Sequence, residues 1–383
     1  MPWCNHTKKS YIVKYSIHIL QVKYPYIISY FNKSNFIDLP FCTLTPSFPT
    51  LKEDWFFVKK EKSMAVHATF VLPAPNGCNL DCPYCIIAQR KEADYTILTP
   101  EEYVHFLEDI LVHLNINRVS IQGFEPLLPE VWALTHEMLL RATLFLASTS
   151  IVTNGTYLKR CARELSKVCG SVVVSLDGAE AIVHDKLRQS KGSFMHAVEG
   201  IYEAVSVFPK GNIAVNSVLL PKQAHNLSGM PELLNTLGVT EWIISPMIHI
   251  GSGSYRSPLS FVRETILRYS EESKKYGIRV LLSDELRAVA DEETFDVLSV
   301  RSLETDDSIF RLSPDGSCSR GKEILAQSTH VPKWNTVEQP HVFLERVFVE
   351  IERPIPRRTY VAGALARAVL KTHKNKNTLN RRN

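Results

Sequence analysis

Three cysteines fall within eight residues of this 383-residue chain, at Cys78, Cys82 and Cys85. A strand would send neighbouring side chains to opposite faces, and a helix would spread this spacing around its circumference. Only a loop wrapped around a small centre brings the three thiols together. Gly77 and Pro83 supply the turn residues that such a loop needs. The spacing therefore predicts a loop that holds a metal centre.

The number of thiols narrows the kind of centre. A disulfide would leave one thiol over, and structural zinc is closed by four ligands. The next candidates, Gln89 and His105, do not stand at zinc-finger spacing. Iron–sulfur clusters are usually held by four thiolates, so three thiolates on a four-iron cluster leave one iron open. An open position suits a reactive centre. The residues favour such a cluster, and a structural zinc-binding or cluster-binding module remains the alternative.

Strand-like and helix-like segments alternate after Met64, where we expect the folded unit to begin. Thr99 and Glu102 form the capping box of the first helix, with Pro100 in its first turn. About six such units predict an α/β fold, a partial (β/α)6 TIM-like barrel with N- and C-terminal extensions, and active residues on the loops after the strands. The expected strands are 65–72, 118–122, 147–153, 171–176, 212–220, 241–244 and 278–282, and the expected helices are 99–114, 129–141, 157–167, 193–207, 226–237 and 259–276.

Composition bounds the class of protein. The chain is 45% hydrophobic and 22% charged, as in an ordinary globular protein, and no run of eighteen apolar residues predicts a membrane span. Five of the eight cysteines are dispersed, which favours a reducing, cytoplasmic compartment over a secreted disulfide framework. Part of the net charge of +4 comes from a basic tail that contains Lys374, Lys376, Arg381 and Arg382. We interpret this tail as a solvated terminus and not as a nucleic-acid site.

The CxxxCxxC spacing of Cys78, Cys82 and Cys85, with Tyr84 before the last cysteine, resembles the cluster loop of the radical S-adenosylmethionine (radical SAM) enzymes. The resemblance implies one 4Fe–4S cluster on the three cysteines. It also implies that the amino and carboxylate groups of S-adenosylmethionine (SAM) chelate the open iron and that Tyr84 leans on the adenine.

Two turns downstream resemble the SAM-binding segments of that family. Gly123-Phe124-Glu125-Pro126 resembles the Gly-Gly-Glu-Pro segment, whose backbone carbonyls hold the SAM ammonium. Phe124 stands where the family has a second glycine, and a positive φ there would cost about 1–3 kcal/mol. Thr153-Asn154-Gly155 resembles the T-N-G turn and implies that Asn154 is a ligand. Each segment also reads as an ordinary turn.

A third block resembles the sequence S-L-D-G, H-D-x-x-R and G-S/T-F of the subgroup that includes anaerobic sulfatase maturases and other peptide-modifying enzymes. It consists of Ser175-Leu176-Asp177-Gly178, His184-Asp185, Arg188 and Gly192-Ser193-Phe194. The resemblance implies that Ser175 contacts the SAM ribose and Arg188 the methionine carboxylate. A strand-end cap and a surface salt bridge are the plainer explanations of these two residues.

The C-terminal part lacks the cysteines of the extensions that often follow this core. Leu312 to Cys318 resembles the opening hairpin of such an extension, but Cys318 is the only cysteine after residue 282. A second complete cluster therefore cannot form there, which also argues against the molybdenum-cofactor cyclase branch. We expect four segments: an N-terminal extension of unknown structure at 1–63, the core barrel at 64–283, a truncated extension without its own cluster at 284–335, and a C-terminal helix and basic tail at 336–383.

The resemblance implies an enzyme that reductively cleaves SAM to a 5'-deoxyadenosyl radical, which takes hydrogen from a substrate such as a peptide or protein. It further implies a reductant such as flavodoxin or ferredoxin. From the composition and the basic tail we expect no membrane or nucleic-acid partner. No residue stands out as the catalytic acid or base. A relative that binds SAM without radical activity remains the second alternative.

Overall fold

The computed structural model describes residues 66–85, 97–220, 224–247, 259–282, 309–320 and 331–347. The chain divides into two units, Met1–Lys62 and Ser63–Asn383, and every described residue belongs to the second. The expected extension at 1–63, the boundary at Met64 and the basic tail lie outside the described residues.

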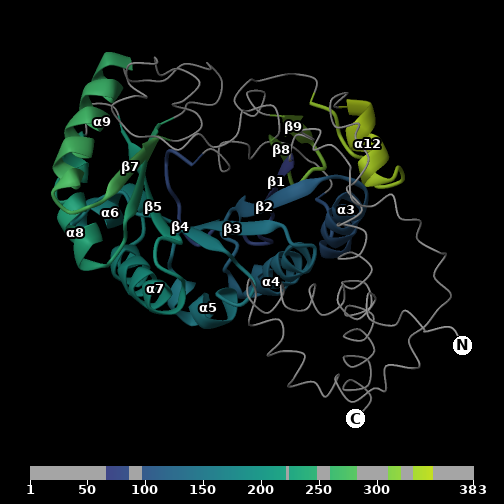
Figure 1. Ribbon diagram of the computed structural model, residues 1–383, viewed down its shortest axis with the longest axis horizontal. Helices are drawn as coiled ribbons and strands as arrows, with labels where there is room; N and C mark the ends of the chain where they lie inside the picture. Colours follow the sequence, from purple (N-terminus) through teal and green to yellow (C-terminus); the bar gives the residue numbers. More distant parts are fainter. Residues whose placement is uncertain are drawn as a thin grey trace, which may run out of the picture. The chain divides into compact units, whose positions relative to one another are not determined.

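One sheet runs through the described residues, with nine strands in the order β7-β6-β5-β4-β3-β2-β1-β8-β9. All neighbouring strands are parallel except β8 and β9, which are antiparallel. The sheet curves into an open barrel with helices on its outer side (Figure 1), which confirms the predicted α/β partial barrel. The strands are β1 (Val66–Leu72), β2 (Ile116–Gly123), β3 (Ser148–Thr153), β4 (Ser171–Ser175), β5 (Ile213–Leu219), β6 (Glu241–Pro246), β7 (Arg279–Leu282), β8 (Ile309–Leu312) and β9 (Cys318–Arg320).

The helices follow local sequence signals. Helix α3 begins with the predicted capping box, in which the Thr99 hydroxyl accepts from the Glu102 amide and the Glu102 carboxylate accepts from the Thr99 amide. Its apolar stripe is buried against the sheet. The described helices are α3 (Pro100–His113), α4 (Pro129–Leu144), α5 (Leu158–Leu165), α6 (Ala181–Arg188), α7 (Ser193–Val207), the 3₁₀ helix η3 (Ala224–Leu227), α8 (Met230–Thr236), α9 (Leu259–Lys274) and α12 (Pro340–Val347).

The C-terminal segments extend the sheet beyond β1. Strand β8 pairs with β1 from His67 to Phe70, and the predicted hairpin turn leads from β8 into β9. Phe106 on α3 packs edge-on against Phe70 and Trp334, with ring centroids 6.2 and 5.0 Å apart. Residues from both ends of the described chain therefore share one core.

Because β1 to β7 are parallel, the loops after them meet at one edge of the sheet. The cysteine loop follows β1, the Gly123 segment ends β2, the Asn154 turn follows β3, and Ser175 ends β4. None of the helices in the described ranges combines the length and apolar character that a membrane span needs.

Candidate active site

The first half of the cysteine loop is tied to the turn after β3. The side-chain nitrogen Nδ2 of Asn154 donates to Asn79 Oδ1 (2.9 Å) and lies 3.7 Å from the Cys78 sulfur. The Thr156 hydroxyl closes the ring, because it accepts from Asn79 Nδ2 (2.9 Å) and donates to Asn154 Oδ1 (2.6 Å). The Leu80 amide also points at the Cys78 sulfur, at 3.4 Å. Cys78 is thus held in place by the turn that contains Asn154.

Glu125 locks that turn to the end of β2. Glu125 is 1% exposed. Its carboxylate accepts hydrogen bonds from the backbone N–H of Leu127 (3.0 Å), the Thr153 hydroxyl (2.6 Å) and the backbone N–H of Asn154 (2.7 Å). Burial raises the pKa of Glu125, although these three hydrogen bonds oppose the shift. The side chain is therefore engaged with the protein itself, and its part in SAM binding remains a prediction.

The second half of the loop is tied to the segment after β4. The Tyr84 hydroxyl donates to Asp177 Oδ2 (2.5 Å), and Arg188 Nε lies 2.6 Å from the same oxygen. The other Asp177 oxygen accepts from the Val218 amide on β5 (2.8 Å). Arg188 Nη1 reaches the Cys82 sulfur at 3.7 Å. A fully buried carboxylate therefore joins the cysteine loop, β5 and α6.

The electrostatics of this group depend on burial. Desolvation and the neighbouring Asp177 charge raise the pKa of Tyr84, so its hydroxyl stays protonated and donates. Asp177, Tyr84 and Cys82 raise the pKa of Arg188 despite its burial, so the guanidinium is a permanent charge. Arg188 therefore does form an ion pair, but with the buried Asp177 and not at the surface as the plainer explanation of the sequence had it.

The three cysteines suit a metal centre. All are partly exposed, and N–H groups point at the sulfurs of Cys78 and Cys82. Burial raises the pKa of Cys78 to about 11 and also raises that of Cys82. An isolated thiolate is therefore unfavourable at Cys78, whereas a coordinated metal removes the proton outright. N–H donors at sulfur are also a means by which proteins tune iron–sulfur clusters. The donor set fits a cluster held by thiolates.

The backbone at the end of β2 resolves the question raised by Phe124. The left-handed φ falls on Gly123, at +147°, while the non-glycine residues with positive φ in the described ranges are Leu146, Gln189 and Thr336. Phe124 therefore carries no strain of the kind considered above. A Cβ at Gly123 would lie 2.4 Å from the Leu72 carbonyl oxygen, so this position requires glycine.

Ser175 lies apart from the two cysteine-loop networks. It is in register with Asn216 on β5, whose Oδ1 accepts from the Ser245 hydroxyl at 2.7 Å. Three half-buried polar side chains thus follow one another across β4, β5 and β6. This row lies near the same edge as the cysteine loop, and the contact of Ser175 with a ribose stays a prediction.

Sequence reasoning missed several residues that hold the site together. The sequence motif gives Asp177 no role, although a carboxylate two residues after a parallel strand is a signal of a functional position. Asn79 and Thr156 carried no such signal, because their roles depend on contact between segments 77 residues apart. Cys318, by contrast, is fully buried in β9, and burial raises its pKa.

The segment that contains the cysteine loop and the turns after β2, β3 and β4 is similar in sequence to known proteins. The sequence profile of the radical SAM superfamily matches residues 72–226. The AdoMet-dependent heme synthase of Methanosarcina barkeri is 27% identical over 210 residues, which are 52% of this chain and 56% of that protein. The probable GTP 3',8-cyclase of Methanocella arvoryzae is 32% identical over 133 residues, 34% of this chain and 41% of that protein. The chain spans about half the length of these curated relatives.

A solved structure shares the fold. Streptococcus suis SuiB bound to precursor peptide SuiA superposes with a TM-score of 0.54 at 13% identity, over 73% of this chain and 65% of that one. Members of the radical SAM superfamily use a 4Fe–4S cluster and SAM, and the three-cysteine loop lies within the matched segment. Residues 72–226 are thus similar in sequence to the radical SAM superfamily, and this segment contains the three-cysteine loop and the turns that follow β2, β3 and β4.

Proposed function

We propose that this protein is a radical SAM enzyme that cleaves SAM reductively and takes a hydrogen atom from a substrate. The observation that carries the proposal is the double attachment of the cysteine loop. Asn154 reaches the Cys78 sulfur from one side and Arg188 reaches the Cys82 sulfur from the other. With Cys85 as the third thiolate, one iron of a 4Fe–4S cluster is left open for SAM.

Bound cluster and SAM would supply the one-electron chemistry, and the protein would orient them and exclude water. Asn154 and Arg188 would hold two cluster ligands in place through N–H groups. We further assign SAM contacts to residues at the ends of β2 to β4, in the cysteine loop and on α6: Tyr84, Gly123, Phe124, Glu125, Asn154, Ser175 and Arg188. Asp177 supports this assignment, because it fixes both Tyr84 and Arg188. A low-potential electron carrier such as flavodoxin or ferredoxin would deliver the electron.

The decisive experiment compares SAM cleavage by three forms of the full chain. Wild-type protein, Cys82→Ala and Cys161→Ala are reconstituted anaerobically with iron and sulfide, reduced with dithionite and supplied with SAM. Cys161 is a partly exposed cysteine on α5, outside the loop, and serves as the matched control. We expect 5'-deoxyadenosine from wild type and Cys161→Ala and none from Cys82→Ala.

Other results would favour the alternatives. A cluster spectrum without any 5'-deoxyadenosine would indicate a SAM-binding relative that performs no radical step. Zinc in place of iron, with no visible chromophore, would indicate a structural metal-binding module. Equal product from Cys82→Ala and wild type would contradict the assigned ligand.

For the substrate we propose a peptide or protein. The block from Ser175 to Phe194 resembles peptide-modifying members, and SuiB, which shares the fold, was solved with a precursor peptide. An extract of deuterium-labelled cells, separated into polypeptide and small-molecule fractions, tests this. Deuterium should enter 5'-deoxyadenosine from the polypeptide fraction. Transfer from the small-molecule fraction alone would contradict the assignment.

A further inference from the structure

A second group of ligand-type side chains lies at the other end of the barrel. Asp109 and His113 stand one turn apart on α3, and His341 comes from the first turn of α12. Helix α3 ends at His113, close to the beginning of β2 at Ile116. The group therefore lies at the edge where strands begin, opposite the edge that carries the cysteine loop.

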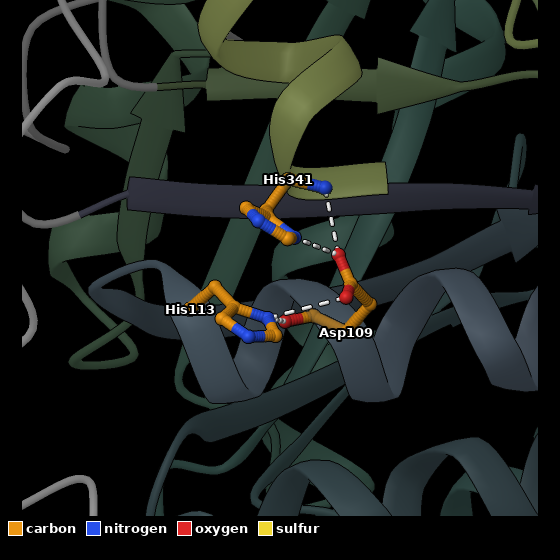
Figure 2. A group of neighbouring side chains, drawn as sticks. All are labelled: Asp109, His113 and His341. Carbon is orange, nitrogen blue, oxygen red and sulfur yellow. Dashed lines mark hydrogen bonds and ion pairs between the residues drawn. The ribbon is translucent and has the colours of Figure 1, made fainter. Parts of the chain in front are cut away.

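The two imidazole rings both approach the Asp109 carboxylate (Figure 2). His113 Nδ1 lies 3.2 Å from Asp109 Oδ1 and 2.9 Å from the Asp109 backbone oxygen, and His341 Nδ1 lies 2.7 Å from Asp109 Oδ2. One ligand atom from each residue lies within 4.8 Å of the other two. The imidazole rings stack with centroids 3.9 Å apart. Both Nδ1 atoms and the carboxylate thus face one small volume.

We propose that Asp109, His113 and His341 form a second metal site, for a divalent transition ion of the zinc type. Two imidazole nitrogens and one carboxylate oxygen are ligands that zinc takes, at about 2.0–2.2 Å. The ion fits between the two imidazole nitrogens and the carboxylate if the nitrogen–oxygen distances widen modestly. The His113 side chain is 45% exposed, so water completes the coordination.

The carboxylate is already fixed as a metal ligand would be. Asp109 is 8% exposed, and its Oδ2 accepts from the His341 backbone amide at 2.7 Å. Hydrogen bonds of this kind orient a ligand and raise metal affinity. Because the ligands come from positions 109 and 341, a bound ion would fasten α12 to α3. It would be a structural site, separate from the cluster at the opposite edge.

The test measures zinc bound per chain after dialysis against excess Zn²⁺ and removal of loose metal. Four full-length forms are compared: wild type, His113→Ala, Asp109→Asn and His196→Ala. Asp109→Asn keeps an oxygen that accepts from the His341 amide but removes the charge that a metal needs. His196 is an exposed histidine on α7 and serves as the matched control. All four keep the cysteines, so zinc held there cancels in the comparison.

We expect wild type and His196→Ala to hold one zinc ion per chain more than His113→Ala and Asp109→Asn. We also expect added Zn²⁺ to raise the midpoint of thermal unfolding of wild type more than that of His113→Ala. Equal zinc content in all four forms would overturn the proposal. The three residues would then be a hydrogen-bonded contact between two helices.

Discussion

Replacement of Asp177 by Asn tests whether the buried ion pair holds the cysteine loop in place. The Arg188 and Asp177 side chains are 10% and 0% exposed. An amide at position 177 can still accept from the Val218 amide, but it no longer neutralises Arg188. Removal of one partner from a buried pair costs about 3–5 kcal/mol, because the other charge is left buried and uncompensated. We expect Asp177→Asn to lower the urea midpoint by about 1–2 M.

The measurement is urea unfolding followed by circular dichroism at pH 7, under reducing conditions. Glu199→Gln is the control, because Glu199 forms a 3.1 Å ion pair with Lys159 in which the side chains are 45% and 59% exposed. Such a surface pair contributes at most about 1 kcal/mol. If Asp177→Asn cost no more than Glu199→Gln, the ion pair would not be what anchors the loop.

Two further predictions concern the backbone and the response to acid. Gly123→Ala should lower the free energy of unfolding more than Gly192→Ala does, and it should abolish iron incorporation. The reason is that a Cβ at position 123 would meet the Leu72 carbonyl, whereas a Cβ at position 192 meets nothing within 4 Å. Equal stability and equal iron content of the two variants would contradict this. Burial and the Arg188 charge lower the pKa of His184 to about 4. Its neutral form therefore stabilises the fold above pH 6.5, and about 3 kcal/mol is lost as the pH falls to 4. His184→Gln should flatten that loss in urea unfolding, and an unchanged pH dependence would refute it.

Elements with strong local signals were predictable from the sequence. Helix α7 runs from Ser193 to Val207, as expected, and α3 begins at its predicted capping box. Helix α6 was missed because its signals are weak. Its N-cap residue Glu180 makes no side-chain cap hydrogen bond, and its C-cap Gln189 adopts φ 50° without being glycine.

Long-range pairing was not predictable. Strand β8, in the segment that we expect to be an extension of the core, lies against β1, more than 200 residues away in the sequence. No local pattern specifies that partner. The metal ligands could be proposed from spacing alone, whereas the roles of Asp177 and Asn79 appear only when separate loops meet at the strand ends.

Three thiolates, from Cys78, Cys82 and Cys85, should hold a 4Fe–4S cluster and leave one iron for SAM. This arrangement can be examined by electron paramagnetic resonance of the reduced, anaerobically reconstituted protein, recorded with and without SAM. We predict the signal of a reduced 4Fe–4S cluster that changes when SAM is added, and no such cluster in Cys82→Ala. A cluster signal that SAM leaves unchanged, or a protein that binds no iron, would contradict the account.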